Sequence, residues 1–440
     1  MSQIVYRICA LLQQVLRPVP VGTNLGLFHL LLALVSGRFL NARGAVMPAL
    51  AEMGLPDEAV RRAQAALTYG RWKTAELVLA WHLLVLSEAR WQPHCYEGYR
   101  RVACDLVGFF RPRLVGCVQK HYQSQADKAL PAVVLGMIGP VGSVANASRL
   151  ALPRALVRAE IGDTSEKDLQ RRTLRQAGRD LKPDEVVAAD AGFSLQDMLN
   201  SKVARYVLRR DKNFTARRNC LPAYKGHGRH REYGEVVRPL ARGYKDRWLE
   251  ATPPDATARW RVGGRTVRAL IFLNLVDKEA KPGWARLRCV VVLDPKYKEP
   301  MVLVTNLEIS AEAIWRLYRD RWAIEQLPLW AKQMLGAEQA FVFGQESRVR
   351  LPELALLAGN LLSYVAATGP AMATGFWDRC ARPTCGRLRR MLCRLDFSKL
   401  TLVGGELRKK ESPTAHLPKG VAAHRRQKAE QTLEGLPAAA

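Results

Sequence analysis

The sequence predicts an α/β protein that begins with an all-helical region and carries a β-rich insertion in its second half. Three observations predict this class. Apolar residues recur at helical spacing through most of residues 1–98, with Gly and Pro between the segments. From about Tyr99 the pattern changes to short apolar runs typical of buried strands, separated by helical stretches. Two long strand patterns, at 257–277 and 284–294, then precede a final amphipathic helix.

The composition indicates a large globular protein with a polyanionic partner. The chain has 440 residues, enough for two or three domains, and 48% of them are hydrophobic. Its formal net charge is +28, spread along the whole length, which favours nucleic acid over an anionic membrane surface as the partner. Nine cysteines without a CxxC pair indicate reduced thiols, and the apolar run Leu25–Val35 is too short to span a bilayer.

Residues 1–98 form the first expected domain. Several short helices ahead of a core suit a DNA-recognition module of the helix-turn-helix kind. A purely structural helical cap would have the same pattern, so both interpretations stay open. The helical segments are expected at 3–16, 24–37, 41–53, 57–68 and 71–91.

Residues 99–210 predict the first part of an α/β core. The order of elements is three strands, helix, strand, helix and strand. The helix at 164–181 is expected to be capped by Asp163 or Thr164. The strands are expected at 101–105, 130–145 (strand, turn, strand), 150–161, 185–190 and 204–208, with a short helix at 194–201.

A β-rich insertion at 211–308 separates this part from the last part of the core, at 309–370. Asn213–Gly243 is rich in Arg, Gly, His and Tyr and is expected to be a DNA-facing loop. The strand patterns after it contain Gly263-Gly264, which signals a hairpin turn. Residues 371–440 are expected to be a basic C-terminal region, partly disordered.

The predicted helix Ala311–Leu335 closes the core and carries a polar stripe. At about 100° per residue, Tyr318, Arg321, Glu325 and Lys332 point within about 60° of one another. The other residues are mostly apolar, so this stripe is expected to line a cleft. Pro328 lacks an amide donor and is expected to kink the helix one turn after Glu325. The alternative is a solvated face with a weak Arg321–Glu325 pair.

The spacing Tyr-x2-Arg-x3-Glu-x6-Lys in this helix resembles the motif of one large group of bacterial insertion-sequence transposases of the DDE class, which act by cut and paste. The resemblance implies that Glu325 is the third metal-binding carboxylate. It also implies that Tyr318, Arg321 and Lys332 hold phosphates of the transposon ends.

Two aspartates are the candidates for the first and second acids. The order of the core elements resembles the RNase H-like fold, which gathers its carboxylates at the end of the first strand, the end of the fourth strand and the closing helix. Asp105 and Asp190 lie at these strand ends, and the run VVAADAGF around Asp190 resembles the second-acid motif of the same transposase group. Asp127 and Asp163 compete with Asp105. Taken singly, each aspartate also fits a turn residue.

A carboxylate cluster of this kind implies a two-metal centre. Two Mg²⁺ ions are the expected cofactors, with Mn²⁺ as a substitute, because these cations prefer oxygen ligands and assist phosphodiester cleavage. Arg209 and Arg210 follow the fifth strand and are expected to contact the DNA backbone, although ordinary surface charge is the alternative. Trp260 and Trp284 are candidates for stacking on a flipped base, and each also fits a core tryptophan.

The resemblance implies a transposase that binds terminal inverted repeats as a homodimer and joins transposon ends to target double-stranded DNA. Such a protein is expected in the bacterial cytoplasm, associated with the nucleoid and not with a membrane. One rival is a catalytically silent DNA-binding protein on the same scaffold. Another is an RNase H-like nuclease or resolvase.

Overall fold

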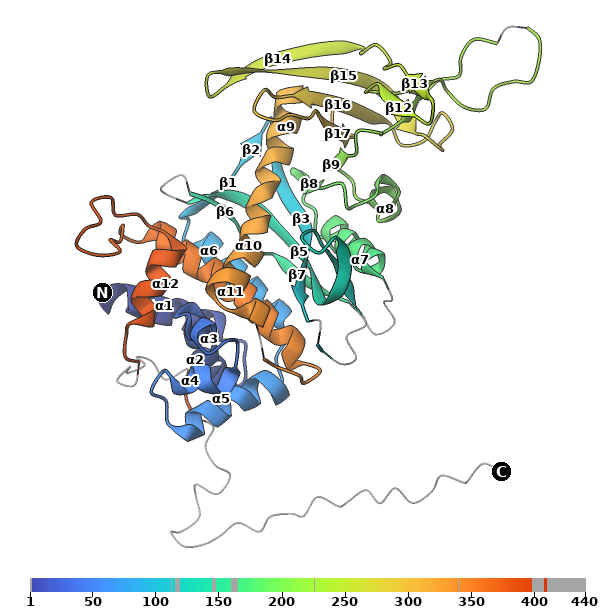
Figure 1. The fold of residues 1–440 in the computed structure, drawn as a ribbon. Coiled ribbons are helices and arrows are strands. Elements are labelled where there is room, and N and C mark those ends of the chain that lie inside the picture. The colour runs from blue at the N-terminus through green and yellow to red at the C-terminus, as the bar shows by residue number, and fades with distance from the viewer. Residues whose placement is uncertain are drawn as a thin grey trace, which may run out of the picture.

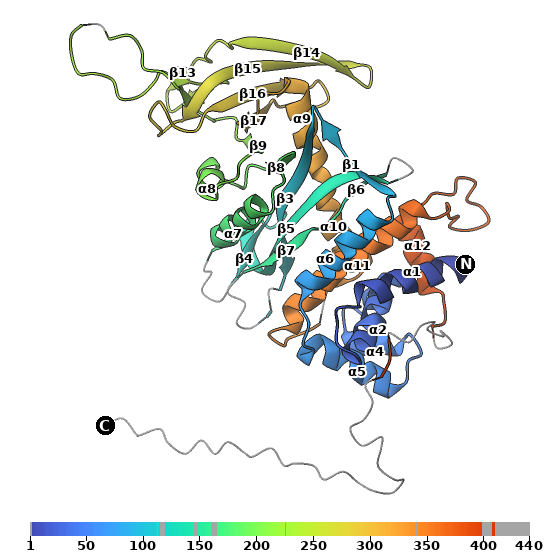
Figure 2. The ribbon, with the colours of Figure 1, turned by 180° about the vertical axis from the view of Figure 1, so that it is seen from behind.

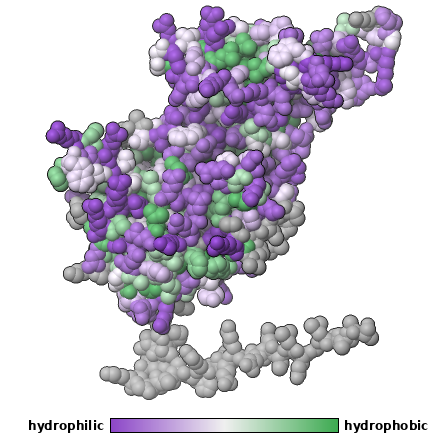
Figure 3. All heavy atoms as spheres, viewed as in Figure 1, coloured by the Kyte–Doolittle hydropathy of each residue, from purple (hydrophilic) through white to green (hydrophobic). Residues whose placement is uncertain are grey.

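The chain forms a mixed α/β molecule in which one large sheet connects a helical end to a β-rich end (Figure 1). The computed structural model describes residues 2–111, 113–114, 119–144, 148–159, 165–224, 226–339, 341–397 and 407–409. Asp163, Thr164 and the basic tail from Lys410 onward lie outside the described residues. Much of the face in view is hydrophilic, with smaller hydrophobic areas between (Figure 3).

Six helices precede the sheet. The helix predicted at 41–53 is shorter, at 46–51, because the left-handed residues Arg43 and Gly44 separate it from the short helix before it, which ends at Asn41. The prediction of an all-helical region up to residue 98 is wrong at its end, since β1 (Trp91–Pro93) and β2 (Cys95–Tyr96) precede the core strands. The helices are α1 (Ser2–Val15), α2 (Thr23–Val35), α3 (Arg38–Asn41), α4 (Val46–Ala51), α5 (Asp57–Tyr69) and α6 (Thr74–Ser87).

Five strands make the centre of the sheet, in the order β7-β5-β3-β8-β9. β5 is antiparallel to both β7 and β3, whereas β3, β8 and β9 are parallel. Their chain order, with α7 (Glu166–Arg179) before β8 and α8 (Leu195–Asn200) after it, is the predicted one. The strands are β3 (Tyr99–Phe110), β5 (Lys128–Val144), β7 (Ala155–Arg158), β8 (Glu185–Ala189) and β9 (Tyr206–Arg210).

The segment predicted at 130–145 does not turn: its residues 130–144 lie within one long strand, β5, and residue 145 lies outside the described residues. Pro140 is tolerated because it lies where one neighbour of β5 changes, between β7, which ends its pairing at Ile138, and β6 (Ser148–Ala151), which begins at Val141. The Pro140 carbonyl accepts a bond from Leu152 in the loop between these two strands. A short strand, β4 (Lys120–Gln123), pairs with the beginning of β5.

Alternating side chains of β3 contribute to two separate cores. Val102 and Cys104 pack with residues of α7, and Ala103 and Val107 pack with the helical end of the molecule. The view from behind shows α7 on one side of these strands and α6 and α11 (Ser347–Thr368) on the other (Figure 2). Asp105 therefore belongs to the strand face that meets the closing helix.

The insertion extends the same sheet, because β17 pairs with β9 in antiparallel fashion. The hairpin prediction is confirmed: Val262 pairs with Arg265 across Gly263 and Gly264, both of which have positive φ. The strands are β10 (Ala216–Arg218), β11 (Val236–Val237), β12 (Arg242–Tyr244), β13 (Arg247–Leu249), β14 (Ala256–Val262), β15 (Arg265–Asp277), β16 (Leu287–Leu293) and β17 (Met301–Thr305).

The closing helix is not one regular α-helix. It begins as α9 (Ala311–Arg319), tightens to a 3₁₀ helix over Asp320–Glu325, returns to α10 (Gln326–Leu329) and widens to a π-helix over Trp330–Met334. Pro328 cannot donate to the Ile324 carbonyl, so the regular ladder is interrupted at this point. The number of residues per turn therefore changes on both sides of Pro328, whereas the sequence predicts only a kink.

The last helices join the first ones. α11 packs against α1, α2, α5 and α6, and α12 (Cys385–Cys393) packs against α11. Among the described residues, α11 alone is long and apolar enough to cross a membrane, and 94% of its apolar window is buried inside the protein.

Candidate active site

Three carboxylates that are far apart in the sequence meet at one guanidinium group. Arg321 Nη1 lies 2.8 Å from Asp105 Oδ2, and Arg321 Nη2 lies 2.7 Å from Glu325 Oε1. The same Nη2 lies 3.7 Å from Asp190 Oδ2. Asp105, Asp190 and Glu325 are thus gathered around Arg321.

The sheet register explains why the two aspartates are neighbours. β3 and β8 are parallel, and Ala103 is paired with Ala188. Asp105 and Asp190 each follow two residues after this pair, so they lie side by side beyond it, on one face of the sheet. The backbone amide of Gly192 donates to Asp190 Oδ1 at 2.9 Å, which holds that carboxylate in a local turn. Asp190 thus has the turn geometry of the simpler interpretation and also lies at the cluster.

The closing helix brings the other two members of the cluster. α9 begins at an N-cap, Ser310, whose hydroxyl accepts the Ala313 amide at 3.1 Å. Its apolar face packs Ile314 and Leu317 into the core over β8 and β9. The 3₁₀ segment then carries Arg321 and Glu325 across β3.

The cluster is partly shielded from water. The side chains of Arg321 and Asp105 are 7% and 19% exposed, and those of Asp190 and Glu325 are each 39% exposed. Burial raises the pKa of Asp105 to about 6, against the opposing effect of Arg321 and with support from the two other carboxylates. Arg321 stays charged, because its carboxylate neighbours raise its pKa although burial opposes them.

The donor set fits a hard divalent cation. Three carboxylates supply only oxygen ligands, as Mg²⁺ and Mn²⁺ prefer. In this structure the Arg321 guanidinium lies between them, and within the described ranges no three Asp, Glu, His or Cys side chains are grouped closely enough to hold an ion. The three carboxylates thus have the ligand chemistry for a divalent cation but are not grouped as a metal site in this structure.

Tyr318 and Arg209 extend this cluster. The Tyr318 ring lies 5.7 Å from the centre of the Arg321 guanidinium, and Arg209 lies close enough to its hydroxyl to act on its pKa. Burial raises the pKa of Tyr318, so its hydroxyl stays protonated. Arg209 is exposed, whereas Arg210, on the alternate face of β9, donates to the Phe193 carbonyl. Arg209 therefore lies with the cluster and Arg210 does not.

Lys332 lies away from the acids. Its Nζ atom is 5.5 and 5.2 Å from the ring centres of Phe109 and Phe110 and 3.8 Å from Glu338 Oε1. These rings are four and five residues beyond Asp105 on β3, roughly 15 Å along the strand. The predicted common face of the four motif residues assumes a regular helix, and the 3₁₀ and π segments change the rotation per residue.

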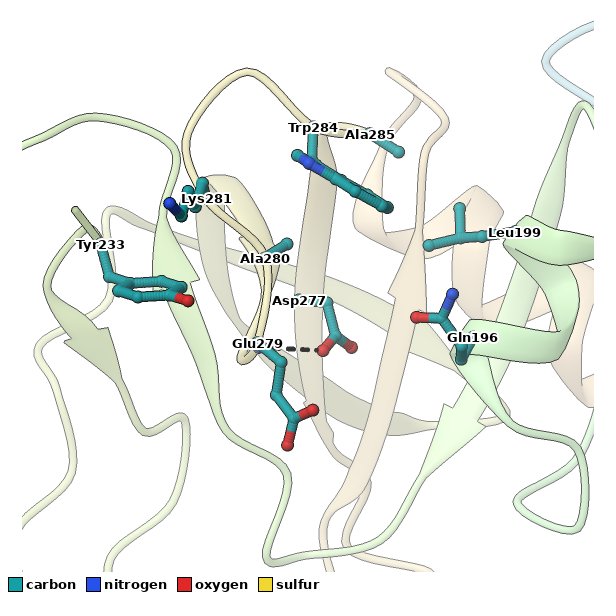
Figure 4. A pocket seen from close by; sticks show the side chains of 9 residues that line it. All are labelled: Gln196, Leu199, Tyr233, Asp277, Glu279, Ala280, Lys281, Trp284 and Ala285. Carbon is teal, nitrogen blue, oxygen red and sulfur yellow. Dashed lines mark hydrogen bonds between the residues drawn. The ribbon is translucent and has the colours of Figure 1, made fainter.

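The remaining candidates have separate surroundings. Asp127 lies in the turn between β4 and β5, where it accepts a bond from Tyr122. Trp260 is 8% exposed and packs against Trp315, as a core tryptophan does. Trp284 is 58% exposed and lines a cavity of about 250 Å³ between α8 and the insertion (Figure 4).

One buried acid of the closing helix was not among the sequence candidates. Asp320 is 3% exposed and has four polar partners from the strands beneath it. An aspartate between Arg319 and Arg321 suggests an ordinary surface charge when only the sequence is considered. The residues that surround it lie far away in the sequence, so the sequence has no direct signal for its burial.

Comparison with protein-family models finds a match, which covers the middle of the chain. Residues 148–361 match the model of the transposase DDE domain. This span contains Asp190, Arg321 and Glu325, whereas Asp105 precedes it. No curated protein matches the chain. Residues 148–361 therefore carry the features of a transposase DDE domain, and the match supports a DDE-type transposase.

Proposed function

We propose that the protein is a cut-and-paste transposase of the group with the Tyr-x2-Arg-x3-Glu-x6-Lys motif. It would bind the terminal inverted repeats of a mobile DNA, cleave at its ends and transfer the strands to target DNA. The observation that carries the proposal is the gathering of Asp105, Asp190 and Glu325 at Arg321. The family match over residues 148–361 supports it independently.

We also propose that the core is RNase H-like, with the insertion between its fifth strand and closing helix. The central order β7-β5-β3-β8-β9 supports this, because its first three strands are antiparallel and the next two join in parallel. The insertion starts directly after β9 and ends before α9. The proposed divisions are 1–98, 99–210, 211–308, 309–370 and 371–440, with DNA recognition assigned to the first.

In the proposed mechanism some residues hold the cations and balance charge, and others position the DNA. Two divalent cations would supply an activated water and neutralise the charge of the scissile phosphate. Asp105, Asp190 and Glu325 would hold them, with Arg321 balancing the carboxylate charge. Tyr318 and Arg209, which adjoin the same cluster, would donate hydrogen bonds to phosphate oxygens beside the cleaved bond. Lys332 and Arg210 would contact the DNA backbone farther from the scissile bond.

The charge of the protein supports a nucleic-acid partner. A net charge of +28 attracts a polyanion, and long DNA offers the contact length that so many cations require. We propose a homodimer in the DNA complex, because cut-and-paste transfer uses two transposon ends together. The proposed location is the bacterial cytoplasm, at the nucleoid.

The test is cleavage of labelled duplexes that carry the DNA flanking the coding sequence on each side. Purified protein is incubated with these duplexes and Mg²⁺, and the wild type is compared with Glu325→Gln. We expect the variant to lose cleavage by about 100-fold or more while its binding to the duplex stays within about twofold.

Glu312→Gln is a matched control for this variant. Glu312 and Arg316 form an i,i+4 ion pair on the same helix, as do Arg321 and Glu325, but away from the acids. Equal cleavage by wild type and Glu325→Gln would disprove the assignment of Glu325. Binding without cleavage by the wild type would favour the silent DNA-binding protein. Cleavage without strand-transfer products would favour an RNase H-like nuclease or resolvase.

A further inference from the structure

Asp320, the residue before Arg321, is the centre of a second charged cluster beside the acid cluster. Its carboxylate is 5% exposed and is surrounded by donors from the underlying strands. The contacts are 2.6 Å from Oδ2 to His94 Nδ1, 2.6 Å from Oδ2 to the Tyr96 hydroxyl, 3.2 Å from Oδ2 to Arg101 Nη1 and 3.1 Å from Oδ1 to Arg149 Nη2.

Three of these donors come from separate strands, and the fourth, His94, lies between β1 and β2. Tyr96 lies in β2, Arg101 in β3 and Arg149 in β6. His94 Nε2 is 2.6 Å from the Ser143 hydroxyl on β5. Arg101 also donates to the carbonyls of Leu317 in α9 and Val141 in β5. Asp320 therefore ties the helix directly to three strands, β2, β3 and β6, and its partners His94 and Arg101 extend the cluster to β5.

The charges in this cluster are balanced within the protein. Arg101 is fully buried, and burial lowers its pKa to about 10 although Asp320 opposes this. Burial would raise the pKa of Asp320, but hydrogen bonds and the nearby cations hold it well below its usual range. A buried charge is tolerated when several hydrogen bonds satisfy it, and such a group then has one favoured geometry.

Asp320 and Arg321 are consecutive residues of the same 3₁₀ turn, and each of them is bound by one of the two clusters. Residues in a 3₁₀ helix are separated by about 120°, so Asp320 and Arg321 leave the backbone in different directions. Asp320 points to the cations of the strands, and Arg321 points to Asp105, Asp190 and Glu325. Fixing Asp320 thus fixes the direction in which Arg321 and, four residues on, Glu325 approach the other acids.

We propose that Asp320 is a positioning residue for the acid cluster: its contacts with His94, Tyr96, Arg101 and Arg149 hold the 3₁₀ turn so that Arg321 and Glu325 reach Asp105 and Asp190. The inference rests on the proposed function, since it assigns Asp320 to the support of that same site. Three of its partners, His94, Tyr96 and Arg101, precede the span matched by the family model. The support is therefore built largely from this chain's own segment ahead of the matched domain.

The test measures divalent-ion affinity and not only activity. Mn²⁺ is titrated into the full-length protein without DNA, and free Mn²⁺ is followed by electron paramagnetic resonance. We expect Asp320→Asn to weaken Mn²⁺ binding by about tenfold or more, because supporting partners of metal ligands have effects of this size. Binding to the flanking-DNA duplex should stay within about twofold, and Asp320→Glu should recover part of the Mn²⁺ affinity.

Asp294→Asn is the matched control. Asp294 is also a buried acid, 5% exposed, and is held by Arg265 in the insertion, away from the cluster. A merely structural role for Asp320 predicts that both variants lower the thermal midpoint and leave Mn²⁺ affinity unchanged. That result, or an equal loss of Mn²⁺ affinity in both variants, would overturn the inference.

A second variant keeps the test decisive if Asp320→Asn does not fold. Tyr96→Phe removes one hydrogen bond to Asp320 and leaves no unpaired charge, so we expect an about two- to tenfold weaker Mn²⁺ affinity. Wild-type affinity in Tyr96→Phe would then overturn the inference. If the wild type itself neither binds Mn²⁺ nor cleaves DNA, the proposed function fails first, and the inference falls with it.

Discussion

The carboxyl group of Asp105 is the most buried acid of the cluster. It lies on a central strand, and its side chain is 19% exposed, so water solvates its charge poorly. Burial raises its pKa to about 6, and Arg321 keeps the value from rising further. Near neutral pH the group is therefore mostly ionised, although its pKa is only slightly below that pH.

This pKa leads to a pH dependence of cation binding. Because only the carboxylate form binds a metal, we expect Mn²⁺ affinity to be nearly constant above about pH 6 and to fall about tenfold per pH unit below it. Titrations of Mn²⁺ between pH 5 and 8 check this, with Asp127→Asn as a control that should keep the wild-type profile. A profile that stays level down to pH 5 would contradict the role of Asp105.

The same raised pKa gives the stability of the metal-free protein a pH dependence opposite to that of cation binding. The folded-state pKa of Asp105 lies above the ordinary value of 3.8, so the protonated form is favoured by folding. Its contribution is fully present below about pH 4 and is lost as the pH rises through about 6. Stability and cation binding at this residue therefore have opposing pH requirements.

At the scale of elements, the capping of α7 corrects the sequence-based expectation and gives a separate test. The sequence suggested Asp163 or Thr164 as the cap, and both lie outside the described residues. In the structure Ser165 is the N-cap, and its side chain and that of Asp168 form a capping box. The cap therefore lies one residue after Thr164, and Asp168, three residues after Ser165, is the acid of the capping box.

Replacing Ser165 by Ala should destabilise the protein by about 1 kcal/mol, because one helix amide loses its acceptor. Chemical denaturation of the full-length protein measures this change. Ser165→Thr is the control, since Thr keeps the hydroxyl and should lose at most a few tenths of a kcal/mol. An equal loss in both variants would show that the cap is not the cause.

Predictions from local pattern succeeded where local chemistry decides the structure. The hairpin at Gly263-Gly264 follows from residues that accept positive φ, and the end of β8 before Asp190 follows from an apolar run that stops at an acid. The predicted strand end at Asp105 is wrong, because β3 continues past Asp105 to Phe110. The convergence of these acids with Glu325 required the order of the strands, which the resemblance to a known fold supplied.

Predictions failed where the geometry depends on distant partners. The Gly-Pro sequence in β5 looks like a turn, but β3 pairs along it, and β6 and β7 meet β5 on either side of Pro140, where no amide donor is needed. Likewise, the 3₁₀ turn of the closing helix is held by Asp320 contacts from residues 94–149, far away in the sequence. The position of Lys332 depends on that winding and is therefore not accessible from helical periodicity alone.

At the scale of the whole molecule, the first helices and the closing helices share one hydrophobic core. Leu27 and Phe28 of α2 belong to the same buried cluster as Leu354 and Leu361 of α11. Polar contacts cross this boundary as well: the Trp81 indole donates to Asn360 at 2.7 Å, and the Asn360 amide donates to the Ala151 carbonyl at 2.7 Å. The helical region therefore supports α11, which in turn packs against β5 beneath the acid cluster.

This shared core predicts that a chain starting at Ala89 will not fold alone. Removing α1–α6 would expose the apolar face of α11, and we expect the fragment 89–440 to be insoluble or to lack a cooperative thermal transition. Co-expression with the fragment 1–88 should restore a soluble complex, because Ala89 is an exposed turn residue and a break there removes no core contact. Size-exclusion chromatography and circular dichroism distinguish these outcomes. If 89–440 alone is monomeric and melts at the wild-type midpoint, the helical region is a separate module, and its contacts with α11 are dispensable for folding.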